Sequence, residues 1–158
     1  MNQLNKTTED LRIKKQTILQ MGGEAAIQKQ HEAGKLTARE RIHLLFDSGT
    51  FVEIGALGTS AAVSAEVADK NTPADAVITG WGQINGRKAL VIAYDFTVIA
   101  GTIGEVGERK SARIRQIALS ERIPLIWLLD SAGARIQEIA SSRFAETGVM
   151  FYDQVTLS

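Results

Sequence analysis

The feature that most constrains the fold is an apolar run that ends abruptly in small residues. Its sequence is Leu125-Ile126-Trp127-Leu128-Leu129-Asp130-Ser131-Ala132-Gly133-Ala134-Arg135-Ile136-Gln137-Glu138. The apolar half predicts a fully buried strand, the small residues predict a tight turn, and the remainder predicts the first turn of a helix. Because such small side chains leave backbone N–H groups bare at a helix N-terminus, the turn is a candidate oxyanion site.

Composition sets the outer limits. With 158 residues and 44% hydrophobic content, the chain is long enough for one domain with a real core. Eighteen basic residues balance eighteen acidic ones, so we expect neither nucleic acid nor an anionic membrane as a partner. The absence of cysteine excludes disulfides and thiolate metal ligands, and no metal site is expected. Without a signal peptide or a membrane-length apolar run, we expect a soluble, cytoplasmic protein.

The N-terminal third favours helix. Residues 7–20 and 24–32 predict two helices separated by Gly22-Gly23, and Gly34 is placed to end the second one. Thr37-Ala38-Arg39-Glu40 matches a capping box and opens a third helix that ends near residue 47. We therefore expect a helical arm over residues 1–46, followed by the main domain over residues 47–158.

Beyond the arm, the pattern becomes α/β. Strands are predicted over residues 51–54, 75–84 and 87–94, and Asn85-Gly86 predicts a tight hairpin between the last two. A helix from residue 103 to about 121 then leads to the apolar run, so parallel strands crossed over by helices are expected. A last helix is predicted with Ser141 or Ser142 as its cap, and its apolar surface requires a partner. That surface consists of Phe144, Val149, Met150, Phe151 and Val155.

Five strings of residues, taken in order along the chain, point to one family. They are Gly34-Lys35-Leu36-Thr37-Ala38-Arg39-Glu40-Arg41-Ile42, Phe51-Val52-Glu53, Val77-Ile78-Thr79-Gly80-Trp81-Gly82-Gln83-Ile84-Asn85-Gly86-Arg87, Asp95-Phe96-Thr97-Val98 and the string from Asp130 to Glu138. Together they resemble the N-terminal part of the biotin-dependent acyl-CoA carboxyltransferases. That family includes propionyl-CoA carboxylase β subunits and the methylmalonyl-CoA and glutaconyl-CoA decarboxylase subunits.

The resemblance implies a crotonase-like (ClpP/crotonase) spiral of strand-strand-helix units, here incomplete, with the helical arm in front of it. It implies transfer of a carboxyl group between carboxybiotin and the α-carbon of an acyl-CoA thioester. The implied partners are acyl-CoA, a biotin carboxyl carrier protein or domain, the remaining carboxyltransferase segments and further copies of the chain as a homo-oligomer. Relatives continue beyond this region, so the chain alone is expected to be inactive.

Site residues follow from the same resemblance. It implies that the backbone amides of Ala132 and Gly133 hold the oxygen of a thioester enolate, although Ala132 stands where the family often has glycine. A further six residues are predicted to bind acyl-CoA. In addition, Lys35 and Arg41 are possible ligands of the CoA phosphates. The six residues are Gly101, Thr102, Ile103, Gly104, Ala134 and Arg39.

Other interpretations stay open. The turn and the glycines can serve close packing alone, and the basic residues can be a solvated helix face. Asp130, Arg135 and Glu138 are interpreted first as structural partners of one another and of backbone amides. Ser131 is a poor nucleophile candidate, because its surroundings lack the G-x-S-x-G pattern and the only histidines, His31 and His43, lie in the arm. The alternative functions are a non-catalytic CoA-binding or assembly module and, less favoured, a crotonase-fold hydrolase.

Overall fold

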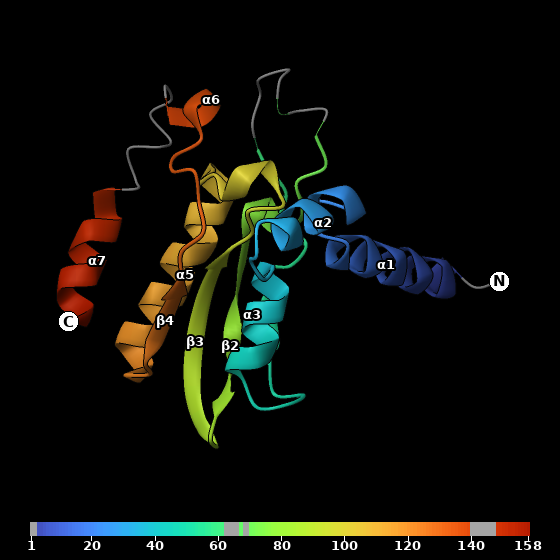
Figure 1. The fold of residues 1–158 in the computed structure, drawn as a ribbon. Helices are drawn as coiled ribbons and strands as arrows, with labels where there is room; N and C mark the ends of the chain where they lie inside the picture. The colour runs from blue at the N-terminus through green and yellow to red at the C-terminus, as the bar shows by residue number, and fades with distance from the viewer. Residues whose placement is uncertain (1–2, 62–66, 68–69, 140–147) are drawn as a thin grey trace.

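The structure, a computed structural model, describes residues 3–61, 67, 70–139 and 148–158. A four-stranded sheet has a helix on each face, and two further helices extend away from it on the side of the N-terminus (Figure 1). The described α-helices are α1 (Gln3–Leu19), α2 (Glu24–Glu32), α3 (Ala38–Leu45), α5 (Glu105–Glu121), α6 (Ile136–Ile139) and α7 (Val149–Leu157), and two short 3-10 helices are η1 (Pro73–Ala76) and η2 (Ile99–Gly101). The strands are β1 (Val52–Ile54), β2 (Val77–Ile84), β3 (Arg87–Tyr94) and β4 (Leu125–Leu128).

The predicted capping box starts α3. The Thr37 hydroxyl accepts from the Glu40 amide at 3.3 Å, and the Glu40 carboxylate accepts from the Thr37 amide at 2.7 Å. The helix then packs Ala38 and Ile42 into the core against β2 and β3. Thus α3, which the sequence places in the arm, covers one face of the sheet, whereas α1 and α2 extend beyond it (Figure 1).

The predicted hairpin joins β2 and β3 in antiparallel register from Val77–Tyr94 to Ile84–Arg87. Asn85 and Gly86 both have positive φ, 51° and 75°, as a two-residue hairpin turn requires. The Asp47 carboxylate accepts hydrogen bonds from both turn amides, at 3.0 and 2.9 Å. The turn is therefore stabilised by its own residues, which adopt positive φ, and by Asp47, which follows α3.

Alternate residues of β2 and β3 build two cores. Ile78 and Val91 face α3, whereas Val77, Leu90 and Ile92 face Ile114 and Ala118 of α5. Because side chains alternate along a strand, this period-two pattern buries both faces of the hairpin. The hairpin is the part of the sheet that the two covering helices share.

The strand β4 differs from its prediction. It pairs in parallel with β3 after the α5 crossover, as expected, but all four of its residues are only half-buried. The strand order is β1-β2-β3-β4, so β4 lies at an edge of the sheet. The prediction of a fully buried strand is therefore wrong for this structure, because one edge of β4 has no neighbouring strand among the described residues.

The last helix, α7, packs on α5 and leaves apolar side chains exposed. Val149, Phe151 and Val155 are 50%, 67% and 78% exposed, as expected for a face that needs a partner. The predicted serine caps and Phe144 lie outside the described residues. Within the described part of the chain, no helix combines the length and apolar character needed to cross a membrane.

Candidate acyl-CoA site

The turn after β4 lies against the segment that precedes α5. Ile103 and Ala134 form an isolated parallel bridge, in which the Ile103 amide donates to the Gly133 carbonyl and the Arg135 amide donates to the Ile103 carbonyl, both at 2.9 Å. Gly133 has a φ of 99°, which only glycine adopts without strain. The structure therefore brings together two of the predicted groups, residues 101–104 and residues 132–134.

The amides of this turn are occupied. The Ala132 amide donates to the Ala100 carbonyl at 3.0 Å, and the Gly133 amide donates to the Ser131 hydroxyl at 3.0 Å. The prediction that they are bare is wrong for this structure, because the turn pairs with the neighbouring segment before it reaches the helix. An oxyanion role for these amides stays a prediction, and it requires the ligand oxygen to replace one of these acceptors.

Ser131 serves the turn itself. Its hydroxyl donates to the Gly101 carbonyl at 2.6 Å while it accepts from Gly133. His31, by contrast, contacts Glu40 at 3.0 Å, and this contact is the leading cause that lowers the pKa of Glu40 to about 2. The structure gives Ser131 no histidine partner among the described residues, which agrees with the rejection of a serine nucleophile.

The glycines before α5 are closely packed. A Cβ on Gly101 would lie 2.4 Å from the Asp130 carbonyl oxygen, and a Cβ on Gly104 would lie 2.1 Å from Nη1 of Arg135. Both glycines are buried. The structure therefore supports the close-packing interpretation of Gly101 and Gly104, whereas Thr102 and Ile103 are only half-buried. Acyl-CoA binding by these residues stays a prediction.

Arg135, Asp75 and Glu138, here called the Arg135 cluster, form a buried ion network beside the turn. Nη1 of Arg135 contacts the Asp75 carboxylate at 2.7 Å and the Glu138 carboxylate at 2.8 Å. Burial alone would lower the pKa of Arg135, but the two carboxylates outweigh it and raise the pKa. The sequence analysis missed Asp75, since only tertiary structure brings a residue 60 positions away to Arg135.

Asp130 does not join the Arg135 cluster. Its carboxylate accepts from Lys35 Nζ at 3.1 Å and from Gln30 Nε2 at 2.8 Å. The predicted partnership of Asp130 with Arg135 and Glu138 is therefore wrong. Asp130 instead ties the end of β4 to α2 and to the segment that leads into α3.

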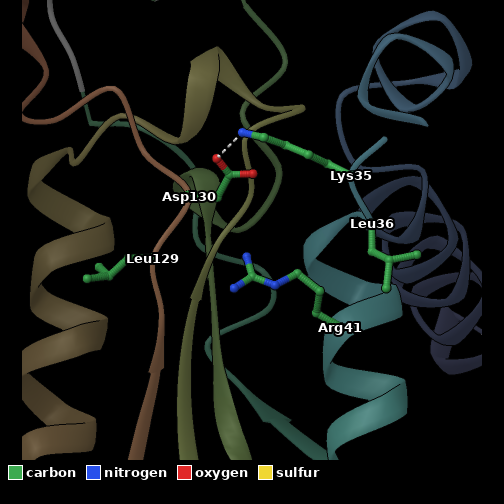
Figure 2. Close-up of a pocket in the computed structure, with 5 residues that line it drawn as sticks. All are labelled: Lys35, Leu36, Arg41, Leu129 and Asp130. Atoms are coloured by element: carbon green, nitrogen blue, oxygen red, sulfur yellow. Dashed lines mark hydrogen bonds and ion pairs between the residues drawn. The ribbon is translucent and has the colours of Figure 1, made fainter. Parts of the chain in front are cut away.

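The predicted basic residues separate into two environments. Arg39 is largely buried and paired with Glu53 at 2.9 Å, so its guanidinium already has a carboxylate partner. Lys35 and Arg41 instead line an open pocket of about 360 Å³ together with Leu36, Leu129 and Asp130. In Figure 2, Arg41 extends from α3 into the space below Asp130, and Lys35 reaches the Asp130 carboxylate from the right. This pocket adjoins the turn through Asp130.

Three comparisons with known proteins agree with one another. The family model for the carboxyl transferase domain matches residues 29–158. A propionyl-CoA carboxylase carboxyltransferase subunit from Haloferax mediterranei is 44% identical over 130 residues, which are 82% of this chain and 25% of that protein. The methylmalonyl-CoA decarboxylase subunit alpha of Propionigenium modestum is 40% identical over 147 residues, 93% of this chain and 28% of that protein.

Solved structures give the same result. The 12S transcarboxylase crystal structure, a hexamer described with methylmalonyl-coenzyme A bound, matches with a TM-score of 0.92 and 37% identity. That match covers 100% of this chain and 31% of the other. The β subunit of P. aeruginosa geranyl-CoA carboxylase matches with a TM-score of 0.79 and 30% identity over 96% of this chain and 27% of the other.

The chain thus spans about a quarter to a third of the length of these relatives. Its strand-strand-helix arrangement has the crotonase-like fold of the matched carboxyltransferases, which confirms the fold predicted from the sequence. Because the family model covers most of the chain, the protein belongs to the carboxyl transferase domain family.

Proposed function

We propose that the chain is the N-terminal acyl-CoA-binding portion of a biotin-dependent carboxyltransferase. The reaction moves a carboxyl group between carboxybiotin and the α-carbon of an acyl-CoA thioester, with the thioester enolate between the two states. Support comes from the carboxyl transferase family match and from a relative whose structure is described with methylmalonyl-coenzyme A. Biotin supplies or accepts the carboxyl group and belongs to a partner protein or domain.

The observation that carries the proposal is the pocket beside the turn. Lys35 and Arg41 present cations to it, and the side chain of Arg41 has no hydrogen-bond partner among the described residues. Phosphate groups of CoA fit such cations through charge-assisted hydrogen bonds. We place the phosphates here rather than at Arg39, because the Arg39 guanidinium is largely buried against Glu53, whereas Arg41 lines the open pocket. The exposed Lys35 would exchange its contact with Asp130 for a phosphate.

The turn adjoining the pocket would receive the thioester. The Gly133 amide now donates to the Ser131 hydroxyl, and an enolate oxygen would be a stronger, charged acceptor in the same direction. In this mechanism the chain supplies binding, orientation and backbone donors. No side chain of the turn acts as acid, base or nucleophile.

Equilibrium binding of CoA tests the pocket. Lys35→Ala and Arg41→Ala are each expected to weaken CoA binding about 10-fold, because each loses a charge-assisted contact to phosphate. Lys88→Ala is the matched control, since Lys88 is an exposed lysine whose ammonium lies over Trp81 rather than in the pocket. Equal effects of all three substitutions, or no CoA binding by the unaltered chain, would contradict the proposal.

A non-catalytic CoA-binding or assembly module is the second candidate. It is favoured by the occupied amides of Ala132 and Gly133, which present no free donor in this structure. Isotopic carboxyl exchange between carboxybiotin and acyl-CoA, with the remaining carboxyltransferase segments supplied, separates the two functions. Exchange supports the carboxyltransferase, and its absence supports the module.

The remaining expectations stay proposals of this same function. They are assembly as a homo-oligomer, a biotin carboxyl carrier partner and a cytoplasmic location. Oligomer formation draws support from the hexameric relative. Light scattering after size exclusion tests it, with a clean monomer as the opposing result.

A further inference from the structure

The Arg135 cluster joins four separate segments of the chain. Besides the two carboxylates, Arg135 donates to the Thr102 carbonyl at 3.0 Å and to the Ser60 hydroxyl at 3.1 Å. Its side chain has no exposed surface. Each carboxylate also caps the first turn of α5: Asp75 accepts from the Gly107 amide at 2.7 Å and Glu138 from the Glu105 amide at 2.5 Å. The segments around Ser60, Asp75 and Thr102 and the turn at 131–135 therefore share one ion network.

The segment that carries Asp75 has an uncommon backbone. Ala74, Asp75 and Ala76 have φ values of 54°, 49° and 61°, and each such non-glycine residue is energetically costly. Lys110 holds this segment on both sides, because its Nζ donates to the carbonyls of Ala74 at 2.8 Å and Val77 at 2.6 Å. This backbone conformation places the Asp75 carboxylate in contact with Arg135.

Burial shifts the pKa values of the groups in this region. It raises the pKa of Asp75, although Arg135 and the Gly107 amide oppose the shift, and it lowers the pKa of Lys110 to about 8. Burial alone would raise the pKa of Glu138, but the Glu105 amide and Arg135 outweigh it and lower the pKa. Removing one member would leave an uncompensated buried charge, which is strongly destabilising.

We propose that Arg135 is a positioning residue for the turn at 131–134, acting through its contact with Asp75. Arg135 directly follows the turn, and its own amide donates to the Ile103 carbonyl, so its side chain and backbone both set the turn against residues 101–103. A lysine cannot reproduce this geometry, because only the planar guanidinium reaches two carboxylates, the Thr102 carbonyl and the Ser60 hydroxyl together. The effect of Arg135 on ligand binding at this turn rests on the proposed function.

Another fully buried arginine, Arg115, provides a matched control. Arg115 is also unexposed and pairs with two carboxylates, Glu108 at 2.7 Å and Asp153 at 2.8 Å, but it joins α5 to α7 rather than to the turn. Arg135→Lys and Arg115→Lys therefore make the same chemical change in equally buried networks. Comparing them separates a positioning effect from a general loss of stability.

Amide hydrogen exchange of the full chain measures the turn directly. In Arg135→Lys, exchange at the Ala132 amide is expected to be at least about 10-fold faster. Amides in the centre of β3 are expected to exchange no faster than global unfolding of the same variant allows. Arg115→Lys is expected to leave Ala132 exchange within about twofold. The inference is overturned if Arg135→Lys leaves Ala132 unchanged, or if Arg115→Lys accelerates it equally.

A second readout concerns the ligand. The ratio of the affinity for a non-reactive acyl-CoA thioester analogue to the affinity for CoA is expected to fall in Arg135→Lys and to stay constant in Arg115→Lys. If exchange changes as expected but neither ligand binds even the unaltered chain, the proposed function fails and the positioning inference stands. Should Arg135→Lys fail to fold, Asp75→Asn removes the same ion pair at constant size, and faster exchange at Ala132 is expected there too.

Discussion

At the scale of single residues, buried ionisable groups distinguish this protein. Among the residues that the structure describes, two arginines are fully buried, each with two carboxylate partners, and Lys110 is held between two backbone carbonyls. Such groups are tolerated in an interior only when paired and hydrogen-bonded. Their positions mark two places where elements are fixed to one another: the base of α5 beside the turn, and the contact of α5 with α7.

Lys110 gives the protein a predicted pH dependence. Burial lowers the pKa of Lys110 from its ordinary value of 10.5 to about 8. Between these values the unfolded state binds more protons than the folded state, so the free energy of unfolding rises with pH across this window. The expected contribution is on the order of 3 kcal/mol. Urea unfolding at pH 7.5 and 10 measures it, and Lys110→Met should flatten the rise. An equal rise in that variant would assign the effect to other groups.

Gly104 is expected to tolerate no side chain. Gly104→Ala puts a methyl group 2.1 Å from Nη1 of Arg135, and relief of that overlap should cost about 1–3 kcal/mol of unfolding free energy. Gly148→Ala is the control, because a Cβ there meets none of the described residues within 4 Å and should change stability by less than about 0.5 kcal/mol. Thermal unfolding of both variants measures the difference, and equal midpoints would contradict this view of the packing.

At the scale of elements, the sequence predicts best where local chemistry decides. Asn85-Gly86 gives the hairpin and Thr37 with Glu40 gives the α3 cap, because both signals act over two to four residues. The edge position of β4 could not be predicted, because the same apolar sequence pattern is expected for a strand with one neighbouring strand and for a strand with two. The packing of α3 on the sheet could not be predicted either, because Ala38 and Ile42 are buried by contact with β2 and β3, which lie far along the chain.

The α3 cap makes a test at this scale. Thr37→Ala removes the hydroxyl that accepts from the Glu40 amide and should cost about 1 kcal/mol of unfolding free energy. Thr37→Ser keeps the hydroxyl and should retain most of that stability. Denaturant unfolding distinguishes the two variants. A Thr37→Ser variant as unstable as Thr37→Ala would assign the effect to the lost methyl group in the core instead of to the cap.

At the scale of the whole molecule, the site could be predicted only in part. The resemblance located the turn at 131–134, and the structure adds that the turn lies against residues 101–104. The occupied amides could not be foreseen, because their acceptors include the Ala100 carbonyl, some 30 positions away. Asp75 was missed for the same reason. Long-range contacts determine which of the predicted groups lie together. They also provide an acceptor for the Ala132 amide, so a ligand oxygen must displace an existing hydrogen bond before it can bind that amide.

The most direct test of the central claim is amide chemical-shift mapping of the chain with a non-reactive acyl-CoA thioester analogue. The account predicts changes around Lys35 and Arg41, which line the pocket, and at residues 131–134, which directly follow the lining residue Asp130. CoA without the acyl group should change the signals around Lys35 and Arg41 and leave Gly133 nearly unaffected. A ligand that binds without changing the signals of the turn, or that changes them equally with and without its acyl group, would contradict the account.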